Sequence, residues 1–114
     1  MPKNTQPKVS VLVPCYNVEK YIDECLASIA NQTLADIEII CINDGSTDGT
    51  LDIIKKYAAN DGRFVIIDKE NEGYGKSMNR GLDAATGEYV AIVESDDWIE
   101  PNALEILYNA AKQN

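Results

Sequence analysis

Near its start the chain reads Val9-Ser10-Val11-Leu12-Val13-Pro14-Cys15-Tyr16-Asn17, a run of branched apolar side chains that passes through a proline into a polar turn. A short run of this kind indicates a buried β-strand. Three more runs rich in branched residues follow, at 37–42, 64–67 and 89–93, and a segment of helical period comes after each. This spacing favours right-handed crossovers between parallel strands. The sequence therefore predicts an α/β fold with four βα units around a doubly wound, mostly parallel sheet.

Apolar side chains recur with helical period after each strand, which predicts four helices packed on the sheet. The helices are expected over 18–29, from the polar cluster 46–48 to near Gly62, from before Met78 to Gly87, and from Pro101 onward. Capping residues, glycine at a helix end and proline in a first turn mark these bounds. The apolar residues expected to face the sheet are Val18, Tyr21, Ile22, Cys25, Leu26, Ile29, Leu51, Ile54, Ala58, Met78, Leu82, Ala85, Leu104, Leu107, Tyr108 and Ala111.

Length and composition bound the class of protein. With 114 residues, 45% of them hydrophobic, the chain can form one compact domain, expected over residues 9–114. Residues 1–8 are polar, carry two prolines and lack the apolar core of a signal peptide, so they are expected to be a disordered lead-in. A formal net charge of −9 repels the phosphates of nucleic acid and of anionic lipid, so neither is expected as a partner.

Cysteine and histidine content excludes several kinds of site. The three cysteines, Cys15, Cys25 and Cys41, are scattered and odd in number, which argues against a disulfide framework or a thiolate zinc site. They are interpreted as small apolar residues in a reducing compartment, so the expected location is cytoplasmic. Because the sequence has no histidine, histidine-based triads and histidine-ligated metals are excluded. A metal ion in this protein must be held by oxygen ligands.

Polar residues stand directly after three of the predicted strands, where ligands bind in sheets of this kind. Glu94, Asp96 and Asp97 follow the apolar run 91–93, so three carboxylates gather at the end of a buried strand. Such groups repel one another unless protons or a cation intervene. Mg²⁺ or Mn²⁺ held by one or two carboxylates, with phosphate oxygens completing its shell, is the simplest answer. The alternative is that the cluster caps the following helix and faces solvent.

Other candidate residues each have a structural alternative. Asp44, in a glycine-containing turn, could accept a hydrogen bond from a base or a ribose, or could only shape the turn. Tyr16 could stack on a base or be a half-buried aromatic. Lys76 and Arg80 could approach a diphosphate or lie on a solvated helix face. Gly81, within a predicted helix, is interpreted as allowing close packing on the sheet.

Taken together, these stretches resemble the family 2 glycosyltransferases, which share the GT-A fold. The motifs that carry the resemblance are residues 9–17, Asn43-Asp44-Gly45-Ser46-Thr47-Asp48-Gly49-Thr50, residues 71–81, and Glu94-Ser95-Asp96-Asp97-Trp98 with Pro101. The resemblance implies that Tyr16 packs near the nucleobase, that Asp44 bonds the base imide, and that Asp96 lies by the ribose and the metal. It also implies that Asp97 is a metal ligand. The family's acidic motif usually opens with aspartate, where this chain has Glu94.

The resemblance implies the nucleotide-binding half of an inverting, metal-dependent transferase that uses a nucleotide-diphosphate sugar, with a UDP-sugar favoured. The nucleotide ligands would be Pro14, Tyr16, Asn17, Asp44, Lys76 and Asp96, and Mn²⁺ or Mg²⁺ would be held by Asp97 and Asp96, with a weaker contribution from Glu94. The acceptor, unknown but of the glycan or lipid-linked glycan class, and the general base are expected beyond Asn114. The chain alone is therefore expected to be inactive, and an uncovered apolar edge would favour self-association. The full-length enzyme is expected in the cytoplasm, at the cytoplasmic face of the membrane.

Rival interpretations fail at particular residues. Gly75-Lys76-Ser77 resembles the end of a Walker A loop, but Glu70 stands where the first glycine is required. A dinucleotide-binding GxGxxG motif is absent from the turn after the first strand, and receiver domains and sugar nucleotidyltransferases need residues that these turns lack. The remaining alternative is a non-catalytic nucleotide-binding or interaction module of the same fold.

Overall fold

A computed structural model describes residues 6–113, and across these residues the chain alternates strands and helices. The strands are β1 (Val9–Cys15), β2 (Ile37–Asp44), β3 (Phe64–Lys69) and β4 (Tyr89–Ile92). The helices are α1 (Ile22–Ala30), α2 (Thr50–Asn60), α3 (Tyr74–Ala84) and α4 (Ala103–Lys112). The predicted α/β class is therefore confirmed.

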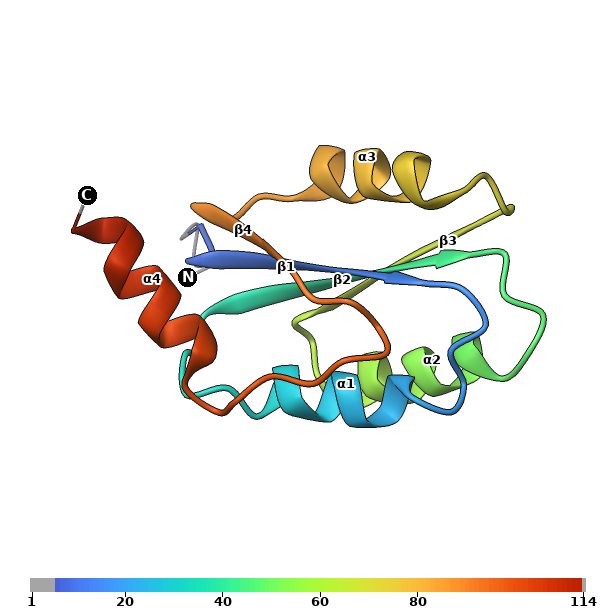
Figure 1. The fold of residues 1–114 in the computed structure, drawn as a ribbon, viewed down its shortest axis with the longest axis horizontal. Coiled ribbons are helices and arrows are strands. Elements are labelled where there is room, and N and C mark those ends of the chain that lie inside the picture. The colour runs from blue at the N-terminus through green and yellow to red at the C-terminus, as the bar shows by residue number, and fades with distance from the viewer. Residues whose placement is uncertain (1–5, 114) are drawn as a thin grey trace.

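All strand pairs in the described sheet are parallel, in the order β3-β2-β1-β4. Val9 pairs with Ile37 on one side and with Tyr89 on the other, and Ile39 pairs with Phe64. Helices α1 and α2 cover one face of the sheet and α3 covers the other, while α4 lies near the start of β1 (Figure 1). The chain thus moves from β1 toward β3 and then returns past β1 to add β4. This reversal makes the carboxyl ends of β1 and β4 the switch point of the sheet.

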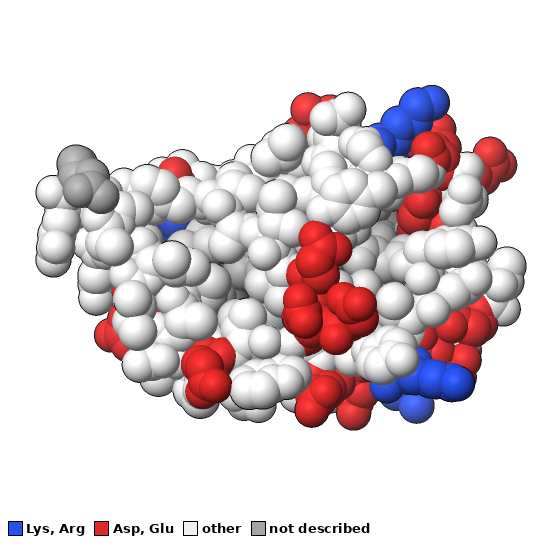
Figure 2. Space-filling model, in the orientation of Figure 1, with Lys and Arg blue, Asp and Glu red and all other residues white. Residues whose placement is uncertain are grey.

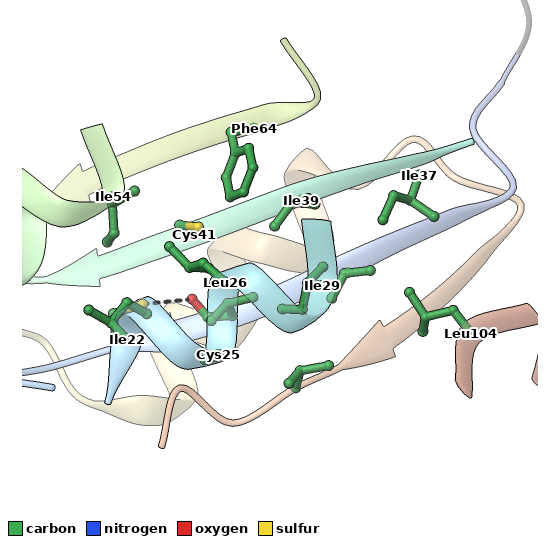
Figure 3. Close-up of a cluster of buried hydrophobic side chains, with 14 of the residues drawn as sticks. Ile22, Cys25, Leu26, Ile29, Ile37, Ile39, Cys41, Ile54, Phe64 and Leu104 are labelled. Carbon is green, nitrogen blue, oxygen red and sulfur yellow. Dashed lines mark hydrogen bonds between the residues drawn. The ribbon is translucent and has the colours of Figure 1, made fainter. Parts of the chain in front are cut away.

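Strand side chains alternate between two cores. Val11, Val13 and Ile39 belong to the larger core under α1 and α2, part of which is drawn in Figure 3. Leu12, Ile40, Ile42 and Met78 form the smaller core under α3. Near-complete burial of β1 and β2 follows from their central position, because both faces of these strands are covered by helices.

Gly81 explains how α3 comes close to the sheet. A Cβ atom at this position would lie 3.0 Å from Cδ1 of Ile42 and 3.2 Å from Cδ1 of Leu12. A larger side chain would therefore push the helix outward. The prediction that Gly81 serves packing is confirmed.

Several predicted bounds were wrong. β1, predicted over 9–13, runs two residues further, as do β2 and β3, whereas β4 ends one residue earlier, at Ile92. α1 begins at Ile22 because Val18 lies in the preceding turn. α2 begins after the 46–48 cluster and α4 after Pro101. Tyr21, Leu82 and Leu107 were predicted to face the sheet but are exposed.

The first described residues are tied to the sheet. The amide of Lys8 donates to the carbonyl of Asp36 at 2.9 Å, and the amide of Tyr89 donates to the carbonyl of Lys8 at 3.1 Å. The expected disordered lead-in therefore does not extend to Pro7 and Lys8, and its residues 1–5 lie outside the described residues.

The three cysteines are free and buried. Burial raises the pKa of Cys25 to about 12, with the charges of Asp97 and Asp96 adding to the shift. Burial also raises the pKa of Cys15 and Cys41 well above the ordinary value. These thiols are therefore protonated at neutral pH and behave as small apolar groups, as predicted.

The outer side of β4 has no strand partner in the described sheet, and Val90 and Ile92 on this strand are exposed. The predicted self-association would use this edge, and it stays a prediction. Over residues 6–113, every helix is too short or too polar to span a membrane.

Candidate nucleotide-binding site

A cavity of about 350 Å³ lies at the carboxyl ends of the strands. It is lined by the end of β1 and the turn that follows (14–16 and Val18), by Asp44 at the end of β2, by residues within 71–77 after β3, and by the loop after β4 (94–96). Every strand therefore contributes to one site. Its volume lies within the range of small-molecule sites, roughly 300–1,000 Å³.

The turn after β1 is fixed by the turn after β2. The amide of Asn17 donates to Oγ of Ser46 at 3.0 Å, and Oδ1 of Asn17 accepts the amide of Thr47 at 2.7 Å. The amide of Val18 donates to Oγ1 of Thr50 at 2.9 Å. Asn17, predicted as a nucleotide ligand, thus links the two turns and does not line the cavity.

Tyr16 and Pro14, both predicted as nucleotide ligands, line the cavity. Tyr16 is 51% exposed, so this residue is open to a ligand. The bonds of Asn17 and Val18 fix the backbone of the turn that follows Tyr16.

Asp44 is buried, and protein donors surround its carboxylate. Oδ1 accepts Nζ of Lys69 and, at 2.8 Å, the amide of Glu72. Oδ2 accepts the amide of Gly73 at 3.0 Å. Burial alone would raise the pKa of Asp44, but these bonds and the Lys69 charge lower it below its ordinary value. Asp44 is therefore an ionised hydrogen-bond acceptor at the wall of the cavity, and it also orders the loop that follows β3.

Lys69 was missed by the sequence interpretation. Its side chain is 4% exposed, and that of Asp44 is 7% exposed, so the ion pair is largely shielded from water. A signal was present, since Asp44 and Lys69 are register partners in the parallel β2–β3 pair. Finding it required the strands to be extended by two residues.

The start of α3 forms one wall of the cavity. Asn71 donates from Nδ2 to the carbonyl of Asp44 at 3.1 Å, and Gly73 has φ 98°, a conformation that favours glycine. Lys76, predicted as a nucleotide ligand, is exposed and does not line the cavity. Arg80 is exposed, with Glu72 as a distant partner at 3.9 Å, so the solvated-face interpretation holds for it.

Ser77 is a second residue that the sequence interpretation missed. It is 1% exposed, it lines the cavity, and its Oγ has no hydrogen-bond partner within the described chain. A signal was again present, because Ser77 stands one helical turn before Gly81 on the row that faces the sheet.

The loop after β4 carries the predicted metal ligands. Glu94 and Asp96 line the cavity, whereas Asp97 does not. The amide of Asp97 donates to the carbonyl of Glu94 at 3.0 Å, which closes a turn. Acidic side chains gather over this loop on the face shown in Figure 2.

Glu94 is engaged by a tyrosine. Its Oε2 accepts the hydroxyl of Tyr74 at 2.7 Å, and this bond is the main reason that the pKa of Tyr74 is raised. In the described part of the chain no group of three or more Asp, Glu, Cys or His side chains is arranged to hold a metal ion. The three carboxylates predicted as a metal site are therefore not gathered into a preformed cluster.

A parallel sheet with helices on both faces and a cavity at its reversal point defines a Rossmann-like α/β domain, in which ligands bind at this place. The sequence matches the profile of Glycosyl transferase family 2 over residues 10–114, and the chain belongs to this family.

Relatives support the family assignment. EpsH of Bacillus subtilis is 50% identical over 105 residues, which cover 92% of this chain and 30% of EpsH. The glycosyltransferase GlyA of Streptococcus pneumoniae is 48% identical over 101 residues, which cover 89% of this chain and 14% of GlyA. The chain thus spans less than a third of the length of these relatives.

Solved structures support the GT-A fold. TarS of S. aureus (residues 1–349) in complex with UDP-GlcNAc has a TM-score of 0.86 at 38% identity, over 93% of this chain and 31% of that one. The mannosyltransferase PcManGT of Pyrobaculum calidifontis, in complex with GDP-Man and Mn²⁺, has a TM-score of 0.80 at 31% identity, over 96% of this chain and 32% of that one.

Proposed function

We propose that this chain is the donor-binding part of an inverting, metal-assisted glycosyltransferase and binds a nucleotide-diphosphate sugar, with a UDP-sugar favoured. The observation that carries the proposal is the single cavity at the sheet reversal, which brings Tyr16, Asp44 and Asp96 together from three different strand ends. The nucleotide-sugar complexes of TarS and PcManGT support the same ligand class.

The base lies between Tyr16 and Asp44 in this proposal. A carboxylate has about four acceptor positions, and three of those on Asp44 are filled by Lys69 and two backbone amides. Nδ2 of Asn71 is 3.5 Å from Oδ2, which makes it a marginal fourth donor. One position is therefore left for an N–H of the base. Uracil and guanine offer such a group beside a carbonyl oxygen.

The residues after β4 fit a cation that arrives with the diphosphate. Mg²⁺ and Mn²⁺ accept one or two carboxylates and take their remaining ligands from phosphate and water, so a closed protein cluster is not needed. Asp96 at the cavity, with Asp97 beside it, would supply the carboxylates, while Glu94 bonds Tyr74. When bound, the cation would stabilise the negative charge on the departing diphosphate.

The remaining steps belong to the whole protein. Because the chain spans 30% of EpsH, we place the acceptor site and the general base in the remainder, with a glycan or lipid-linked glycan as acceptor. The general base would remove the proton of the acceptor hydroxyl while the hydroxyl oxygen attacks the sugar on the side opposite the departing diphosphate. Three free thiols fit a reducing compartment, so we place the reaction in the cytoplasm.

Calorimetric titration with UDP, with and without Mn²⁺, tests the proposal. We expect Mn²⁺-dependent binding, weakened at least about tenfold by Asp96→Asn or Asp97→Asn, because each removes a charged ligand oxygen. Asp83→Asn, which removes an exposed carboxylate on α3, is the charge-matched control and should bind like the wild type. No UDP binding at millimolar concentration would contradict the proposal and favour the non-catalytic module.

A further inference from the structure

Ser77 is a buried residue of the cavity wall whose hydroxyl the described protein leaves without a hydrogen bond. Ser77 is 1% exposed and lines the cavity, yet its Oγ has no hydrogen-bond partner among residues 6–113. A buried hydroxyl without a partner costs stability, and such groups are rare in native structures.

Folding alone gives no reason for serine at this position. Ser77 lies in the first turns of α3, where its amide donates to the carbonyl of Gly73 at 3.1 Å, so the helix is intact without the side chain. Alanine has the higher helix propensity and would leave no unpaired group. A ligand is therefore the expected hydrogen-bond partner of this hydroxyl, because binding pockets contain a few polar groups that fix the orientation of the ligand.

The neighbours of Ser77 indicate which part of a ligand it meets. Gly73, whose amide donates to Asp44, is one helical turn before Ser77, and both Gly73 and Asp44 line the same cavity. The acidic residues after β4 that suit a hydrated diphosphate are exposed, whereas Ser77 and Asp44 are buried. A buried pair of one donor and one acceptor suits a base edge rather than a diphosphate.

We propose that Ser77 is a specificity residue that donates its hydroxyl proton to a carbonyl oxygen of the nucleobase, beside the imide N–H accepted by Asp44. The inference rests on the proposed function and deepens it. Uracil and guanine carry a carbonyl next to a ring N–H, so they match this pair. Cytosine would turn the lone pair of N3 toward the Asp44 carboxylate and would not dock in the orientation that reaches Ser77.

The test compares UDP and CDP binding to the wild type, Ser77→Ala and Ser77→Cys in the presence of Mn²⁺. Alanine removes the hydroxyl, and cysteine keeps the shape of the side chain with a somewhat larger sulfur atom while offering only a weak donor. We expect both variants to bind UDP about fivefold more weakly, the effect of one neutral hydrogen bond. CDP should bind more weakly than UDP to the wild type. In both variants the ratio of UDP affinity to CDP affinity should be smaller, because only UDP loses the hydrogen bond from Ser77.

A stability measurement separates ligand recognition from damage to the fold. Without ligand, the urea midpoint of Ser77→Ala should rise, because an unpaired hydroxyl is removed and helix propensity improves. Asp83→Ala, at an exposed position near the other end of α3, is the control and should leave UDP affinity unchanged.

Each remaining outcome overturns the inference. If the wild type binds UDP and both Ser77 variants bind it equally well, the inference fails while the proposed function stands. If the wild type binds neither nucleotide, the proposed function fails and the inference fails with it.

Discussion

The two sides of the cavity are built differently. On the β2–β3 side, Asp44 is buried, paired with Lys69 and bonded to the amides of Glu72 and Gly73. On the β4 side, Asp96 and Asp97 are exposed, and Glu94 is tied to the rest of the protein through the hydroxyl of Tyr74. The β2–β3 side, to which we assign the nucleobase and which we call the base side, is therefore formed without a ligand. In the proposed function, the β4 side would be completed by the diphosphate and its cation.

Loss of Lys69 is expected to break the base side most strongly. Lys69→Met leaves the Asp44 carboxylate without its cation, and we expect a loss of about 2 kcal/mol in the free energy of unfolding. This is less than for a fully buried pair, because the pair borders an open cavity. Urea denaturation measures it. Lys112→Met, which breaks the exposed pair with Glu88, is the matched control and should change stability little. Equal effects of the two substitutions would contradict the distinction between buried and exposed pairs.

The same ion pair predicts a pH dependence. The folded-state pKa of Asp44 is lowered, so its ionised form stabilises the fold above the unfolded-state pKa, about 3.9. This contribution should disappear as the pH falls below about 4 toward the lower folded-state value. In Asp44→Asn the contribution is absent, so the stability gap to the wild type should be full at neutral pH and close in acid. A gap that is constant with pH would rule out the Asp44 charge as its cause.

The turn after β2 offers a smaller perturbation of the base side. Gly45 has φ 70°, and a Cβ atom there would lie 2.6 Å from the backbone nitrogen of Asn71. Gly45→Ala should destabilise the fold by about 1 kcal/mol, because alanine is strained at positive φ, and it should weaken UDP binding by displacing the 71–73 loop. Gly62→Ala, where the added carbon meets no described atom within 4 Å, is the control and should be neutral. UDP affinity unchanged in Gly45→Ala would argue against a role of this loop.

The β4 side should tolerate change best. Tyr74→Phe removes the hydrogen bond to Glu94 from an exposed tyrosine, and we expect a change within about 0.5 kcal/mol in thermal or urea unfolding. A loss comparable to that of Lys69→Met would show that the β4 side is as rigidly built as the base side.

Sequence patterns predicted the architecture and the place of the site. The four strands, their parallel arrangement and the packing role of Gly81 follow from local periodicity and composition, which each segment carries by itself. Of the predicted site residues, Pro14, Tyr16, Asp44, Glu94 and Asp96 line the cavity.

What the sequence did not reveal depends on neighbours that are distant along the chain. Lys69 matters because the β2–β3 register places it beside Asp44, and Asn17 acts as a link because the turns after β1 and β2 meet. Ser77 is recognised only in the folded structure, where its buried hydroxyl has no hydrogen-bond partner among the described residues. Lys76 was predicted to bind the nucleotide; it is exposed and does not line the cavity, so this role stays a prediction.

The most direct test of a preformed base side and a ligand-completed β4 side is to titrate the wild type with uridine and with UDP, each with and without Mn²⁺. Uridine carries the base and no phosphate, so its affinity should not change with Mn²⁺, whereas UDP affinity should rise at least about tenfold with the cation. UDP affinity that does not change with Mn²⁺, or uridine binding that requires Mn²⁺, would contradict the proposal that only the β4 side depends on the cation.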